Sequence, residues 1–127
     1  MPSIKRDSTP LESDEQIAFI QWCLMAGAPY NTIFAIPNGG KRHISTAARL
    51  RREGVRPGVP DLFLPFAACG AHGLFVELKR IKGGSATQHQ KLWEDVLQKN
   101  GYAHVYAMGC DDAIKKIKLY VNGGAKF

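Results

Sequence analysis

The sequence has few cysteines and no long apolar segment, and each absence excludes a class of protein. Cys23, Cys69 and Cys110 lie far apart and form no C-x-x-C pair, so neither a disulfide framework nor a cysteine-based zinc site is expected. No apolar run approaches the ~20 residues that a membrane-spanning helix needs. The first residues are charged and contain no apolar core, unlike a secretory signal peptide. We therefore expect free thiols in a cytoplasmic protein without a membrane segment.

Several motifs of known mechanism are also missing. The "GGK" at 39–41 lacks the first glycine and the spacer of a P-loop, and the chain contains no G-x-G-x-x-G, so no nucleotide cofactor is expected. No G-x-S-x-G indicates a serine hydrolase. The four histidines show no metal-ligand spacing. His104 alternates with apolar residues of a predicted strand, and we interpret it as structural.

Positive charge is concentrated in one segment. The chain has 127 residues, the size of one domain, and a net charge of +6. Between residues 41 and 56 there are six basic residues and one acidic residue, Glu53. Such a segment suits a polyanion, usually nucleic acid or an anionic membrane surface. It could equally be a solvated helix face that only aids solubility.

Periodicity and end signals predict eight elements. Ser13 with Gln16, and Thr87 with Gln90, match the capping box that begins a helix. The expected buried faces are Ile17, Ile20 and Leu24 in the first helix, and Leu92, Val96 and Leu97 in the third. The predicted helices are 13–27, 45–54, 87–100 and 111–121, and the predicted strands are 32–37, 61–66, 74–80 and 102–108.

This order predicts an α/β domain with a mixed central sheet of about four strands flanked by helices. We expect a flexible leader at 1–12, the domain at 13–121 and a flexible tail at 122–127. The short connection at 67–73 favours a hairpin between the second and third strands. Pro65 suggests that the second strand lies at an edge or ends early.

Two opposite charges lie inside the apolar run "GLFVELKR" at 73–80. Side chains alternate along a strand, so Glu77 and Lys79 project from the same face. Asp61 opens the preceding predicted strand, and in a hairpin it can approach Glu77. Two adjacent carboxylates repel unless a cation or a proton separates them, and a hard ion such as Mg²⁺ takes oxygen ligands of this kind.

Each of these residues also has an ordinary explanation. Glu77 and Lys79 could form a surface ion pair of about 0–1 kcal/mol, and Asp61 after Pro60 could be a turn residue. The joint spacing favours the metal site. Lys79 could then orient or deprotonate a water molecule, or hold a phosphate oxygen, in the hydrolysis of a phosphodiester.

The order "GVPD" at 58–61 followed by "VELK" at 76–79 resembles the signature of the PD-(D/E)XK nuclease superfamily. The chain is more closely similar to its VRR-NUC family over residues 13–110. The similarity includes Glu15 in a first helix, "PNGG" at 37–40, the 54–64 segment, the "FVELKR" strand and Gln90. The Val-Arg-Arg-like stretch of the family appears only loosely, as "HVYAMGC".

The resemblance implies a restriction-endonuclease-like core of order αβββαβ and a role for each matching residue. Asp61, Glu77 and the backbone carbonyl of Leu78 would bind Mg²⁺ or Mn²⁺, and Lys79 would be the catalytic lysine. Glu15 would reach the metal directly or through water, although an acid in a first helical turn is also favoured by the helix dipole alone. Gln90 would support the site, or only cap its helix.

The basic segment would then contact phosphates, which position DNA without reading its sequence. Asn38 could be a turn residue or a ligand to substrate. The expected DNA-binding residues are Asn38, Lys41, Arg42, Arg49, Arg51, Arg52 and Arg56.

We therefore expect a structure-selective, metal-dependent DNA endonuclease that cuts branched DNA such as Holliday junctions or flaps. A homodimer is expected because a domain this small offers one site, and two-fold symmetry is the commonest assembly. The alternatives are a non-catalytic DNA-binding module with the same fold and a nuclease that acts on RNA.

Overall fold

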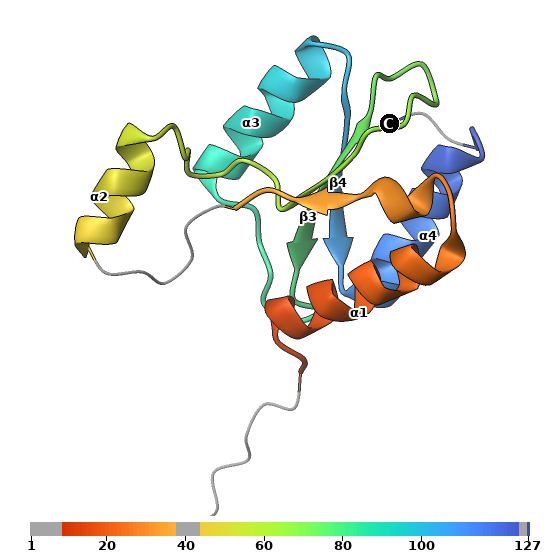
Figure 1. Cartoon of the computed structure of the whole chain (residues 1–127), viewed down its shortest axis with the longest axis horizontal. Helices are drawn as coiled ribbons and strands as arrows, with labels where there is room; N and C mark the ends of the chain where they lie inside the picture. The colour runs from red at the N-terminus through yellow and green to blue at the C-terminus, as the bar shows by residue number, and fades with distance from the viewer. Residues whose placement is uncertain (1–8, 38–43, 125–126) are drawn as a thin grey trace, which may run out of the picture.

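The computed structural model describes residues 9–37, 44–124 and 127. Helices and strands are interspersed along this part of the chain, with β2 followed directly by β3 (Figure 1). The elements are α1 (Glu12–Ala26), the 3₁₀ turn η1 (Tyr30–Thr32), β1 (Phe34–Ala35), α2 (Ile44–Arg52), β2 (Leu62–Leu64), β3 (Leu74–Lys79), α3 (Gln88–Lys99), β4 (Ala103–Met108) and α4 (Cys110–Val121).

The strands form one mixed sheet in the order β1-β2-β3-β4. β2 pairs with β3 in the antiparallel sense, with Leu62 opposite Val76, which confirms the predicted hairpin. β3 and β4 are parallel, and α3 forms the crossover between them. The α/β class and the mixed four-stranded sheet are as predicted.

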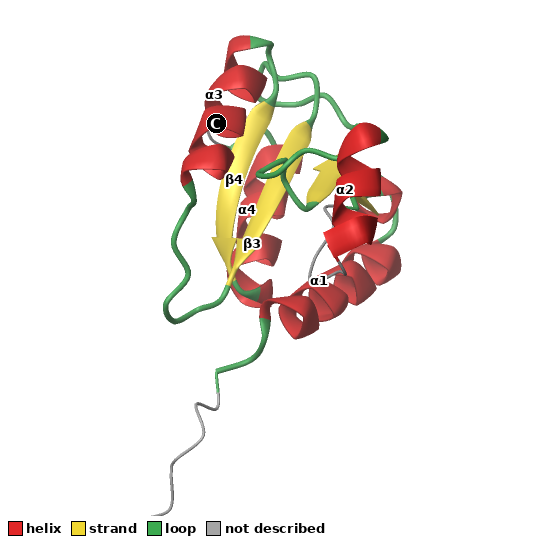
Figure 2. Ribbon diagram, turned by 90° about the vertical axis from the view of Figure 1, so that its left-hand side faces the viewer, coloured by secondary structure: helices red, strands yellow, loops and turns green. Residues whose placement is uncertain are grey.

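One face of the sheet forms the hydrophobic core. Leu74, Val76 and Leu78 of β3 are buried on it, and α1 and α4 cover it with side chains that include Phe19 and Ile117. Full burial of one such side chain contributes about 1.5–3 kcal/mol. α1 and α4 lie on this side of the sheet, while α3 lies on the other (Figures 1 and 2).

The opposite face, beneath α3, is aromatic near β2 and charged near the end of β3. Phe63, Phe75 and Tyr102 contact one another through their rings, with centroids 4.4–6.1 Å apart. His104 of β4 is buried in the same layer and contacts Tyr106, which is opposite Glu77 in the strand register. This layer excludes water from the side of the sheet that holds Glu77.

The first helix differs from its prediction in its start and its buried face. α1 begins at Glu12, and its N-cap is Leu11 without a side-chain hydrogen bond, so the Ser13–Gln16 capping box is wrong. Its buried residues are Glu15, Phe19 and Cys23, whereas Ile17 and Leu24 are 58% and 59% exposed. Apolar residues occur on all sides of this helix, so the periodicity of the sequence alone could not identify its buried face.

Other elements also differ from their predicted bounds or buried faces. The Thr87–Gln90 capping box of α3 is confirmed, but Leu92 and Val96 are exposed and no residue of this helix is fully buried. The first strand is shorter than predicted because η1 occupies residues 30–32. β2 ends at Leu64, directly before Pro65, which cannot donate a ladder hydrogen bond.

The predicted basic segment is only partly described. α2 contains Arg49, Arg51 and Arg52, all exposed, and stands apart from the sheet at one end of the molecule (Figure 1). Arg56 follows it and is also exposed. Asn38, Lys41 and Arg42 lie outside the described residues. Within the described ranges, no helix combines the length and apolar character that crossing a membrane requires.

Candidate metal centre

Glu77 and Lys79 are buried charges at the end of β3. Their side chains are only 3% and 7% exposed, and Lys79 Nζ lies 3.8 Å from Glu77 Oε1. They share one face of the strand, as the alternation of side chains predicts. A surface ion pair is therefore excluded, because both groups have left bulk water.

Two further carboxylates approach Glu77. Asp61 directly precedes β2, and its Oδ2 accepts a hydrogen bond of 2.9 Å from the backbone N–H of Leu78. Glu12 comes from the first turn of α1. One oxygen from each of Glu12, Asp61 and Glu77 lies within 4.8 Å of the other two. These three residues are called the carboxylate cluster below.

Gln90 connects the cluster to α3. Its Nε2 donates to Glu77 Oε1 at 2.6 Å, while its Oε1 accepts from Lys79 Nζ at 2.5 Å and from the backbone N–H of Thr87 at 2.9 Å. The same side chain therefore completes the helix cap and holds both charged residues of β3. The capping interpretation of Gln90 is confirmed, and its contacts with Glu77 and Lys79 are compatible with a supporting role at the site, which stays a prediction.

The electrostatics of the cluster favour a bound cation. Burial, followed by the nearby Asp61 carboxylate, raises the pKa of Glu77 to about 8, and the Lys79 ammonium only partly opposes this. The pKa of Glu12 is also raised, first by burial and then by Asp61. Repulsion between adjacent carboxylates is the condition that a proton or a metal ion relieves.

The residues present fit a hard divalent ion. Glu77 Oε2 is buried and has no hydrogen-bond partner among the described residues, which is unusual for a carboxylate oxygen. Gln90 donates to the other oxygen, Oε1, so the hydrogen-bonding capacity of Oε2 is unused within the described residues. Carboxylate oxygens are the ligands that Mg²⁺ and Mn²⁺ prefer. Asp61, Glu77 and Glu12 could hold such an ion.

The structure does not bring Glu15 into the carboxylate cluster. Its Oε2 instead accepts a hydrogen bond of 2.5 Å from the backbone N–H of Cys110, the first residue of α4. A carboxylate there satisfies an otherwise unpaired N–H and favours the helix dipole. Glu15 thus joins α1 to α4, and the interpretation that places it at the metal needs correction.

Glu12 is a member of the carboxylate cluster that the sequence interpretation did not name. It lies three positions before Glu15, almost one helical turn, so both carboxylates project from neighbouring parts of the helix. The available signal was a second acid in the same first turn. Choosing between the two needed the position of α1 relative to β3.

A glycine allows the loop before Asp61 to pack against α3. Gly58 has a φ of +85°, and a Cβ there would lie 2.5–2.7 Å from atoms of His89 and Gln90. Only glycine permits both the backbone conformation and the contact. The loop that ends in Asp61 is thereby fixed against the start of the helix that provides Gln90.

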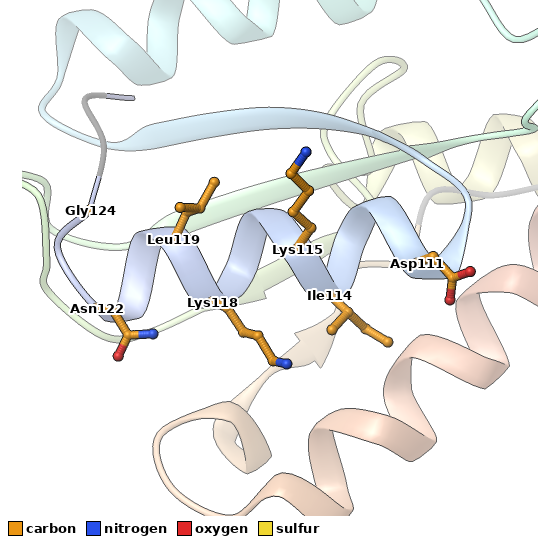
Figure 3. A pocket seen from close by; sticks show the side chains of 7 residues that line it. All are labelled: Asp111, Ile114, Lys115, Lys118, Leu119, Asn122 and Gly124. Atoms are coloured by element: carbon orange, nitrogen blue, oxygen red, sulfur yellow. The ribbon is translucent and has the colours of Figure 1, made fainter.

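A hollow in the surface lies away from the carboxylate cluster. It has a volume of about 440 Å³ and follows the outside of α4, where Ile114, Lys118 and Leu119 line it (Figure 3). Asp111 at one end is its only acidic residue, and none of the predicted site residues lines it. The carboxylate cluster, on the side of the sheet covered by α3, is the better candidate for chemistry.

Comparison with known proteins identifies a similar solved structure. No protein-family model matches the chain. No curated protein sequence matches it either. A solved structure described as "VRR_NUC domain protein" superposes on it with a TM-score of 0.80 and 29% sequence identity, covering 94% of this chain and 95% of that one.

The fold is therefore of the nuclease type. The similarity extends over nearly the whole of both chains, with a buried Glu-x-Lys on β3 and Asp61 beside it. At 29% identity, the chain is similar in fold to that VRR_NUC domain protein.

Proposed function

We propose that this protein is a metal-dependent endonuclease that hydrolyses phosphodiesters in DNA. The observation that best supports this is the buried carboxylate of Glu77, whose Oε2 has no hydrogen-bond partner among the described residues and which has one oxygen within 4.8 Å of oxygens of Glu12 and Asp61. A buried carboxylate with a pKa of about 8 reduces stability near neutral pH, so packing alone does not account for it. Mg²⁺ or Mn²⁺, when bound, would activate a water molecule and stabilise charge on the phosphoryl oxygens.

Each residue of the site has a defined part in this proposal. Asp61, Glu77 and Glu12 would bind the ion through their carboxylates, and the backbone carbonyl of Leu78 would be a further ligand. Lys79 places an ammonium group beside the reacting phosphate, where it stabilises negative charge and orients the attacking water. Gln90 fixes Lys79 and Glu77 relative to each other. Water would attack the phosphorus and the P–O3′ bond would break, which leaves a 5′-phosphate on one product and a 3′-hydroxyl on the other.

The basic segment would hold the DNA backbone. Arg49, Arg51, Arg52 and Arg56 are exposed, and the chain runs from α2 through the loop at 53–60 to Asp61. Asn38, Lys41 and Arg42 belong to the same proposed surface. Phosphate contacts of this kind give affinity that decreases with salt and little sequence preference, which suits recognition of DNA shape.

Branched DNA, such as a Holliday junction or a flap, and a homodimer complete the proposal. A monomer offers one carboxylate cluster, and two symmetric copies would present two, one for each strand. The outer side of α1 exposes Ile17, Leu24 and Met25, which a second copy could cover. The alternative function is a DNA-binding module without catalysis.

A cleavage assay tests the proposal. Labelled duplex, Holliday-junction, flap and RNA substrates are incubated with the protein in Mg²⁺, Mn²⁺ or EDTA. We expect cleavage only with a divalent ion, and loss of cleavage but not of binding in Asp61→Ala and Lys79→Ala. Binding without cleavage of any substrate would support the non-catalytic module, and cleavage of RNA alone would support a ribonuclease.

Glu12 and Glu15 should differ when each is replaced by alanine. Glu12→Ala should lower the affinity for Mn²⁺ by roughly 10-fold to 100-fold, the effect of losing a group that supports a metal site, and leave stability in EDTA unchanged or higher. Glu15→Ala should lower the free energy of unfolding by about 1–2 kcal/mol, because the start of α4 loses its acceptor.

Denaturant unfolding in EDTA gives the stability of each variant, and the Mn²⁺ dependence of Tm gives its metal affinity. Glu15→Ala should keep the metal response of the unmodified protein. If Glu15→Ala abolished that response while Glu12→Ala retained it, the assignment of the two residues would be reversed.

A further inference from the structure

A second hollow, separate from that along α4, opens beside the carboxylate cluster. Its volume is about 300 Å³. Glu12 and Lys79 line it, and both also belong to the site described above. Its remaining lining residues follow β3 directly and have had no role so far; they are Arg80, Lys82, Gly83, Gly84 and Ser85.

Two glycines shape this hollow. Gly83 has a φ of +75°, a backbone conformation that residues other than glycine rarely adopt. A Cβ on Gly84 would lie 2.7 Å from the carbonyl oxygen of Arg80 and 2.8 Å from Cβ of Lys79. The turn therefore folds back onto the end of β3 and brings Ser85 to the same opening as Lys79.

The hollow is positively charged. Lys79, Arg80 and Lys82 line it, against the single carboxylate of Glu12. Arg80 is held in place because its Nη2 donates to the carbonyl of Thr9 at 2.7 Å and its Nε to that of Pro10 at 3.2 Å. Lys82 and Ser85 are exposed and can contact a ligand without rearrangement of the sheet. This combination of an ammonium group and a hydroxyl suits an oxyanion.

The neighbouring site restricts which oxyanion is expected. One nucleic-acid strand has a phosphate about every 3.4 Å along the axis of a duplex. A strand with one phosphate at the carboxylate cluster therefore places the next one close by. The hollow is lined by Glu12 of that cluster and by the adjacent Lys79, so it lies within reach of such a neighbouring phosphate.

We propose that the turn at 80–85 is a binding pocket for the substrate phosphate adjacent to the one that is cut, with Lys82 and Ser85 as its direct contacts. This inference rests on the proposed function and adds a subsite to it. The pocket fixes the register of the strand, so that the phosphate presented to Lys79 is the reacting one.

The first test measures binding of a labelled DNA junction by fluorescence anisotropy in Ca²⁺, over a range of salt concentrations. Lys82→Ala and Ser85→Ala should each weaken binding, roughly fivefold for Lys82→Ala, and Lys82→Ala should reduce the salt slope by about one. The metal-induced rise in Tm should not change. Lys115→Ala is the matched control, because Lys115 is an exposed lysine on α4.

The second test identifies the phosphate. Neutral methylphosphonates are placed one at a time along the strand, and binding is measured with each for the unmodified protein and for Lys82→Ala. At one phosphate next to the cut, the methylphosphonate should weaken binding of the unmodified protein but have little further effect on Lys82→Ala. Equal losses for both proteins at every position would overturn the pocket.

The two proposals can fail separately. If the unmodified protein binds and cuts while Lys82→Ala matches Lys115→Ala in affinity and salt slope, the pocket is wrong and the nuclease stands. If the protein binds but cuts nothing, coupling at a single phosphate still supports the pocket while catalysis is rejected. If the unmodified protein binds no nucleic acid, both are rejected.

Discussion

Glu77→Gln should reduce cleavage by roughly 10³-fold, the scale of removing one group that stabilises the transition state, and should at the same time stabilise the protein in EDTA. Glutamine has the same shape, and its carbonyl can still accept the hydrogen bond that Gln90 Nε2 donates at 2.6 Å. It cannot ionise, so it offers the metal a much weaker ligand at the position of Oε2.

The gain in stability follows from the pKa of about 8. The unfolded chain ionises near 4.5, so this group's contribution to stability is fully present below pH 4.5 and is lost as pH rises toward 8. Glu77→Gln removes that loss. Its free energy of unfolding in EDTA at pH 8.5 should exceed that of the unmodified protein by about 2 kcal/mol or more.

Chemical unfolding with and without EDTA, together with single-turnover cleavage, measures both effects. Gln98→Glu, on the exposed surface of α3, is a control for a change between amide and carboxylate outside the site. An inactive Glu77→Gln that is also less stable in EDTA would indicate a structural role for the carboxylate and would contradict its assignment as a metal ligand.

Metal affinity should increase about tenfold per pH unit between pH 6 and pH 8 and then level off. Below its pKa, Glu77 is protonated, and an ion must displace that proton to bind. Above pH 8 the carboxylate is already ionised, so the competition ends. The pKa of Glu12 is also raised, so its loss of a proton as pH rises should likewise increase metal affinity.

The rise in Tm with Mg²⁺ concentration, measured at several pH values, gives the apparent Kd through its linkage to stability. Glu77→Gln should show a weaker response and a smaller pH dependence. An affinity that is constant from pH 6 to pH 8 would falsify the proton competition, and would mean that Glu77 is ionised before the metal arrives.

The sequence was most informative where its periodicity was clear. Alternation along residues 74–79 placed Glu77 and Lys79 on one face, and a short connection placed Asp61 next to them. These inferences need only strand geometry, which a sequence reveals directly. The capping box of α3 gave the position of Gln90 in the same local way.

The first helix could not be interpreted with the same accuracy. Ile17, Phe19, Trp22 and Leu24 are distributed around it, so several faces looked equally apolar. The choice between Glu12 and Glu15 depended on tertiary contacts: the Arg80 bonds that fix the chain before α1, and the backbone N–H of Cys110 at the start of α4, which donates to Glu15. Contacts between residues 70 or more positions apart leave no periodic signal.

The double role of Gln90 makes the first turn of α3 and the candidate metal site a single cooperative unit. If this turn frays, Glu77 loses its donor and Lys79 loses its acceptor in the same event. A ligand that anchors Glu77 and Lys79 therefore also opposes fraying, although it touches no backbone atom of the helix. Fraying of this helical turn and loss of the ordered arrangement of Glu77 and Lys79 are therefore one equilibrium. A bound substrate or metal would shift it toward the ordered state.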